Sequence, residues 1–238
     1  MRKIFLLLVV CFVVTVTKAQ QDIIVDPNAE ARTLNGSFSS IKVSGGIDLY
    51  LSQSANEAVA VSASEDKFRK LIRTTVEKGI LKIYYDGEKL FVPRNRKLKA
   101  YVSFKEIDKI EAAGASDVTV SGTISVSTLL LDLSGASDFK GLVKVNELKM
   151  DLSGASDVKI GGTAISVNIE SSGASDIKGY DLLVDECTAK SSGASDIEIT
   201  VKKELNAHAS GSSHIYFKGD GKINEMHSSG SSNISRKS

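Results

Sequence analysis

The amino-acid sequence predicts an all-β protein, a right-handed parallel β-helix or solenoid of about seven coils of ~19–20 residues each. The main observation is a short phrase, Ser-Gly-Ala-Ser-Asp, that recurs along the second half of the chain. Its glycines stand at positions 114, 135, 154, 173, 193, 211 and 230, so the spacings are 21, 19, 19, 20, 18 and 19 residues. A nearly constant period of this length is typical of stacked structural repeats.

The residues around each glycine alternate as they do in a half-buried strand. Apolar residues stand four positions before the glycine (Ile110, Leu131, Met150, Ile169, Ala189, Ala207, Met226) and four after it (Val118, Phe139, Val158, Ile177, Ile197, Ile215, Ile234). We expect each repeat to be a strand, a tight turn, a second strand and a second loop, with like residues stacked ~4.8 Å apart. A β-propeller is the competing architecture, but each of its blades needs ~40 or more residues, about twice the period of this repeat. The six-residue sub-period of a left-handed helix is absent, and parallel crossovers favour a right-handed coil.

Residues 1–19 have the pattern of a secretory signal peptide. Met1-Arg2-Lys3 is charged, Ile4 to Val16 is apolar, and Thr17-Lys18-Ala19 is a small-x-small cleavage site. A membrane anchor is the alternative, but the apolar run is short for one. Cys11 raises a lipoprotein alternative, although Val10 before it is larger than such a site prefers. We expect an exported protein, in the periplasm, on the outer surface or extracellular, with no transmembrane segment after cleavage.

Cleavage would leave 27 basic and 29 acidic residues, a net charge of −2. This balance predicts no binding to nucleic acid and none to anionic membranes. Cys187 would be the one remaining cysteine, so no intramolecular disulfide is expected. It lies in an apolar column of the repeat, which predicts a buried, inert thiol.

Three regions follow the leader. Residues 20–35 are polar and predict an extended linker. Residues 36–105 predict an irregular β region that caps the solenoid and is continuous with it, and residues 106–238 predict the repetitive solenoid itself. Within 36–105 we expect strands near 38–51, 58–62 and 100–104, a short helix opened by Ser64-Glu65-Asp66-Lys67, a hairpin around Lys78-Gly79, and a basic loop at 90–99. Ser44-Gly45-Gly46-Ile47-Asp48 resembles a degenerate copy of the repeated turn.

The aspartates that end the repeated phrase form one candidate metal site. Stacking would bring Asp138, Asp157 and Asp176 within ~5 Å of one another, where a ladder of Ca²⁺ ions would offset their repulsion. A structural turn is the alternative, because Asp and Ser side chains accept backbone N–H groups in turns. His214 and Asn233 replace the aspartate in the last two copies while the turn phrase persists, which favours the structural turn. No cofactor other than Ca²⁺ is expected.

The histidines form the second candidate metal site. His208 and His227 occupy the same column one coil apart, so their rings should lie ~5 Å apart. A two- or three-histidine transition-metal site is one interpretation. The other is that they are ordinary solvated side chains on an exposed face.

The sequence favours a binding module over an enzyme. Many β-helices act on polysaccharides, and glycosidases place two carboxylates at a defined separation in a cleft. Here the acidic residues are spread evenly along the coils, and no single constellation interrupts the repeat. The chain has no Trp and few other aromatic residues on which a sugar could stack.

The chain resembles the family of putative auto-transporter adhesin head domains, or GIN domains, which are common in Bacteroidetes-type bacteria. The resemblance covers residues ~35–235, through Phe38-x-x-Ile41-x-Val43, the segment from Leu71-Ile72 to Gly79-Ile80-Leu81-Lys82-Ile83, and the serial Ser-Gly-Ala-Ser-Asp turns. It implies a secreted β-solenoid with an adhesive role and no catalytic residues.

The function expected from these features is a secreted cell-envelope binding or adhesion module, with a glycan or a surface protein as partner. A periplasmic structural or sensory component and a glycan-active β-helix enzyme are the alternatives. The sequence defines no oligomeric state.

Overall fold

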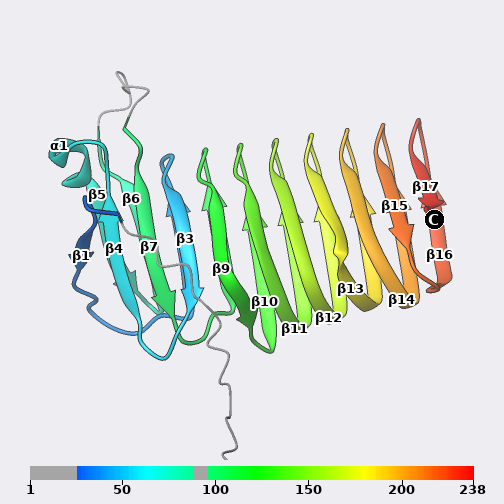
Figure 1. The fold of residues 1–238 in the computed structure, drawn as a ribbon. Helices are drawn as coiled ribbons and strands as arrows, with labels where there is room; N and C mark the ends of the chain where they lie inside the picture. Colours follow the sequence, from blue (N-terminus) through cyan, green and yellow to red (C-terminus); the bar gives the residue numbers. More distant parts are fainter. Residues whose placement is uncertain (1–25, 88–95) are drawn as a thin grey trace, which may run out of the picture.

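The protein is a β-solenoid of about seven turns with one short helix, as the sequence predicts (Figure 1). The computed structural model describes residues 26–87 and 96–238. The expected signal peptide and part of the basic loop lie outside the described residues.

The regular coils are built from parallel strands that stack in register (Figure 1). They are β8 (Lys109–Ala113), β9 (Val118–Ser125), β10 (Thr128–Leu133), β11 (Phe139–Leu152), β12 (Asp157–Ser171), β13 (Asp176–Ser191), β14 (Asp196–Ala209), β15 (His214–Lys218), β16 (Lys222–Ser228) and β17 (Asn233–Arg236). Met150 pairs with Ile169, and Ile169 with Ala189. The apolar columns predicted from the period therefore stack on themselves.

Each long strand contributes to two sheets. The first half of β11 pairs with β9 and its second half with β10, while β12 pairs with both halves. The second loop expected in every coil is therefore replaced, in β11 to β14, by continuous strand that turns the corner. Register shifts occur before the corner, as between Lys159 and Gly162, and at it, between Val184 and Glu186. The inward residues of both sheets, such as Phe139, Met150 and Ile177, are 0–1% exposed and form the core.

The repeated phrase forms the tight turn between the two sheets. Gly154 has a φ of 83°, and a Cβ placed there would lie 2.4 Å from the carbonyl oxygen of Gly135 in the coil before. The position therefore requires glycine for its backbone conformation and for the close approach of the coils. Ser156 is fully buried, and its hydroxyl donates to the carbonyl of Ser153 at 3.1 Å. The second serine of the phrase is thus an internal brace of the turn.

The N-terminal region joins the stack and covers its end (Figure 1). It contains β1 (Glu30–Arg32), β2 (Ser40–Ser44), β3 (Asp48–Gln53), β4 (Ala58–Ser62), α1 (Asp66–Arg69), β5 (Ile72–Glu77), β6 (Ile80–Tyr85) and β7 (Lys99–Phe104). Strands β2 and β3 form a coil of their own, between β8 and β9 on one side and β6 and β7 on the other. Ile47 donates its N–H to Ser116 at 3.2 Å, so the degenerate turn stacks on the first regular one.

Two local expectations need correction. Part of the segment predicted to be a linker is the strand β1, which pairs antiparallel with β4. Helix α1 forms where expected, but its N-cap is Glu65 and no side chain caps it. Packing of the buried Phe68, rather than a capping hydrogen bond, accompanies the turn of helix at this place.

Candidate binding groove along the stacked coils

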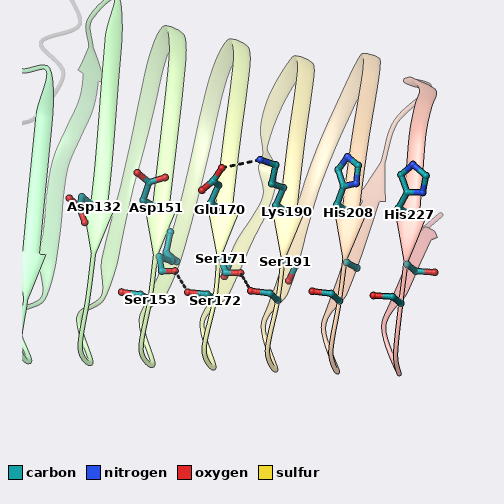
Figure 2. A pocket seen from close by; sticks show the side chains of 16 residues that line it. Asp132, Asp151, Ser153, Glu170, Ser171, Ser172, Lys190, Ser191, His208 and His227 are labelled. Carbon is teal, nitrogen blue, oxygen red and sulfur yellow. Dashed lines mark hydrogen bonds and ion pairs between the residues drawn. The ribbon is translucent and has the colours of Figure 1, made fainter.

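A groove of about 800 Å³ runs across the outer face of the sheet formed by β10, the second halves of β11 to β14, and β16 (Figure 2). Its lining residues stand at the three positions that precede the turn glycine in successive repeats: Asp132, Asp151, Leu152, Ser153, Glu170, Ser171, Ser172, Lys190, Ser191, Ser192, His208, Ala209, Ser210, His227, Ser228 and Ser229. The groove therefore crosses several coils, and each coil adds a similar set of groups at the strand spacing of ~4.8 Å.

One wall of the groove is a row of serines, the first serine of each turn (Figure 2). The Ser172 hydroxyl donates to the carbonyl of Leu152 at 3.2 Å, and the Ser192 hydroxyl donates to Ser171 at 3.4 Å. Each hydroxyl oxygen keeps lone pairs directed to solvent. The row thus offers hydrogen-bonding groups at a regular spacing.

The other wall is a column of acidic, basic and histidine side chains, which runs from coil to coil through Asp132, Asp151, Glu170, Lys190, His208 and His227 (Figure 2). The repulsion expected within the acidic stretch is offset by lysines on the same face. Lys109 lies 2.9 Å from Asp132, Lys149 2.8 Å from Asp151, and Lys190 3.2 Å from Glu170. The hydrogen bond to Asp132 raises the pKa of Lys109, and the one to Asp151 raises that of Lys149.

Sequence reasoning missed these compensating lysines, although the signal was present. Lys109 and Lys149 stand two positions before Glu111 and Asp151, and residues two apart in a strand share a face. Burial opposes ionisation of Glu111, yet its hydrogen bonds from Lys42 and Lys109 hold its pKa below the ordinary value. The acidic residues of this column are therefore paired with lysines, both in the groove wall and beyond it.

The structure brings two of the three histidines together. The rings of His208 and His227 stack with centroids 5.2 Å apart and an angle of 18° between their planes, close to the predicted spacing. Nε2 of His208 lies 3.5 Å from a carboxylate oxygen of Glu225. His214 stands on the other side of the turn, where its Nδ1 is 2.9 Å from the Asp196 carboxylate.

The candidate aspartates lie outside the groove, just after the turn. The Asp138 carboxylate accepts the N–H of Asp157 at 3.3 Å, and the Asp157 carboxylate accepts the N–H of Asp176 at 3.4 Å. Burial, together with the neighbouring Asp117, raises the pKa of Asp138. These contacts give the side chains of Asp138 and Asp157 a structural role.

A metal ion at either candidate site stays a prediction. Within residues 26–87 and 96–238, no group of three or more His, Cys, Asp or Glu side chains is arranged to hold a metal ion. The histidine pair and the aspartate ladder would need ligands from other groups or from water.

Cys187 is 2% exposed in the core, and burial raises the pKa of its thiol to about 12. A thiol with such a pKa is protonated at neutral pH and is a poor nucleophile. In the part of the chain that the structure describes, no helix is long and apolar enough to cross a membrane.

Solved structures with this fold come from species of Bacteroides and Parabacteroides, among others. A "putative adhesin" from Bacteroides fragilis matches with a TM-score of 0.81 and 22% identity over 88% of this chain and 96% of that one. A "putative lipid binding protein" from Parabacteroides distasonis matches with a TM-score of 0.66 and 20% identity, over 90% and 98% of the two chains. A "putative adhesin" from the same species has a TM-score of 0.66 and 21% identity over 88% and 96%. These TM-scores establish a shared fold.

No curated protein matches the chain. The match to a family model does cover most of it, residues 37–221, and that family is described as "Putative auto-transporter adhesin, head GIN domain". The chain therefore belongs to this family of adhesin head domains.

Proposed function

We propose that this protein is an exported adhesion module of the cell envelope and that its groove binds an extended, uncharged glycan chain. The observation that carries the proposal is the groove itself, which repeats a serine hydroxyl in successive coils and faces it with a column of polar side chains. Membership in a family of adhesin head domains supports a binding role.

The chemistry of the walls favours a carbohydrate ligand. Sugars in an extended chain present hydroxyl groups at regular intervals, as the stacked coils present polar groups every ~4.8 Å. Ion-paired carboxylates and ammonium groups bind hydroxyls well without selecting a charged ligand, because their charges are already balanced. The walls therefore suit an uncharged polymer that lies along the solenoid axis.

The expected affinity of one groove is low. None of its described lining residues is Trp, Tyr or Phe, so stacking of sugars on aromatic rings is absent from this lining. Binding would rest on many weak hydrogen bonds, and several modules on one surface would gain avidity from multivalency. A module of this kind suits adhesion better than capture of a single small molecule.

The proposal is tested with a glycan array probed by the mature chain, followed by titration calorimetry on the glycans that bind. Ser172→Gln would fill the groove and should weaken binding at least 10-fold. Thr163→Gln, a similar exposed position outside the groove, is the matched control and should bind as the wild type does. If Ser172→Gln binds unchanged, the groove is not the glycan site.

The location is tested by protease treatment of intact and lysed cells. We expect digestion on intact cells, which would support a role at the outer surface. Protection until lysis would contradict the adhesion proposal and favour the periplasmic structural or sensory alternative.

The proposal includes no catalysis. We expect no release of reducing ends when the mature chain is incubated with the glycans that it binds. Release of reducing ends above the level of the buffer control would favour the glycan-active enzyme instead.

A further inference from the structure

The two ends of the solenoid differ. The N-terminal end is covered by α1, β1 and the strands around them, whereas β16 and β17 are the last strands at the other end (Figure 1). Met226 is 52% and Ile223 38% exposed, although their partners one coil earlier, Ala207 and Leu205, are fully buried. The core of the last coil therefore faces solvent.

The backbone of this last coil also has an open edge. Ser229 and Asn233 donate their N–H groups to Ala209 and Ser213 of the preceding coil, at 3.0 and 3.1 Å. Successive residues of a strand direct these groups to opposite sides, so Met226 and Ile234 direct theirs away from the preceding coil. Such an edge is able to pair with a strand of another molecule.

We propose that a second copy of this chain covers the open end, in a two-fold symmetric dimer joined tail to tail. Strand β16 would pair antiparallel with β16 of the second copy, centred on Met226, and β17 with β17, centred on Ile234. Met226 stands four residues before Gly230 and Ile234 four after it, so one two-fold axis passes through both centres.

The polar side chains on β16 are complementary in this register. Residues at equal distances from Met226 oppose each other, so Glu225 of each copy faces His227 of the other. Both side chains point outward, in line with Asn206 and His208 of the preceding coil. On β17 the same symmetry places Asn233 opposite Ser235, so no like charges meet next to either centre.

The covered N-terminal end favours a closed dimer. Growth of a filament would require the open end of one molecule to stack on the N-terminal end of the next, and there the cap strands β1 and β4 run antiparallel to their neighbours. Contact between two identical open ends closes the assembly at two copies. Two grooves would then lie on one elongated particle.

The dimer is tested by sedimentation equilibrium and light scattering of the mature chain over a range of concentrations. We expect a dimer for the wild type and a dissociation constant at least 10-fold higher for His227→Glu, which places two carboxylates in opposition, and for Glu225→Lys, which removes the carboxylate that faces His227. The double variant Glu225→Lys/His227→Glu restores complementary pairs and should restore the dimer. Glu186→Lys, an exposed acidic position in the middle of the stack, is the matched control.

A second measurement checks the register directly. In the proposed dimer the two copies of residue 226 form a hydrogen-bonded pair with Cα atoms ~5.5 Å apart, within the range that a disulfide spans. Met226→Cys should therefore form a covalent dimer on mild oxidation, and Ile165→Cys, exposed on another part of the solenoid, should not. The proposal would be overturned by a monomer at all concentrations or by a dimer whose dissociation constant does not change in the Glu225 and His227 variants. Equal yields of covalent dimer from Met226→Cys and Ile165→Cys would also overturn it.

Discussion

At the scale of single residues, the glycine, the second serine and the aspartate of the repeated phrase each have a distinct structural role. The glycine allows the left-handed backbone and the close stacking of turns, and the second serine braces the turn from inside. The aspartate accepts an N–H from the following coil, as Asp138 does from Asp157. The phrase recurs because each copy must fit against the one before it.

Replacement of a turn glycine should therefore cost more than its backbone strain. Gly154→Ala requires a non-glycine residue at a φ of 83° and places a methyl group 2.4 Å from the Gly135 carbonyl oxygen. Gly79 has a φ of 77° and no atom within 4 Å of such a methyl group, so Gly79→Ala isolates the backbone cost of about 1–2 kcal/mol. Urea denaturation should show that Gly154→Ala loses about 2 kcal/mol more, because the stacked turns have to move apart. Equal losses at the two sites would mean that the turns stack loosely.

The aspartate ladder predicts a stability that does not depend on calcium. The carboxylates already accept backbone N–H groups, so a chelator should leave the melting temperature unchanged and added Ca²⁺ should not raise it. Asp157→Asn keeps an acceptor oxygen for the N–H of Asp176 and should be tolerated. A rise in melting temperature with Ca²⁺ that Asp157→Asn abolishes would instead establish a cation ladder.

At the scale of elements, the period predicts which residues face inward better than it predicts where strands end. The tight turns lie where the sequence places them, and so do the buried columns up to the last coil, where Met226 is exposed. The second corner of the coil lacks a comparable marker, since the residue there differs from coil to coil, with Asn146 in one and Ile165 in the next. The parallel hydrogen bonds continue around that corner, and one long strand forms where two were expected.

The two faces of β11 should differ sharply in their contribution to stability. Phe139 is 1% exposed between the sheets, so Phe139→Ala should lower the free energy of unfolding by about 3–5 kcal/mol. Leu142, three residues later on the same strand, is 50% exposed, and Leu142→Ala should change it by less than about 0.5 kcal/mol. Both values follow from urea denaturation, and a large loss at Leu142 would indicate that this side chain is covered in solution.

At the scale of the whole molecule, the sequence predicts the solenoid and a cap but not the path of the chain through the cap. Strands β2 and β3 form a coil early in the sequence, and β8 and β9 return to stack on it after β4 to β7 have covered its other side. This order depends on pairings between residues about 70 positions apart, such as Ile41 with Ile110, which no local period encodes. The groove was missed for a related reason, since it is formed by equivalent residues of several coils together.

A stack in which each coil touches only its neighbours should open from its uncovered end. Amide hydrogen exchange should be slowest in β11 to β13, which have neighbours on both sides, and fastest in β16 and β17 of the monomer.

In the proposed dimer, the N–H groups of Met226 and Ile234 gain partners, so their exchange should slow as the protein concentration rises. Glu225→Lys should remove that dependence on concentration while leaving β11 to β13 unchanged. Fast exchange of β16 and β17 at every concentration in the wild-type chain would show that the end stays open, whereas slow exchange at high dilution would show that the last coil is stable without a second copy.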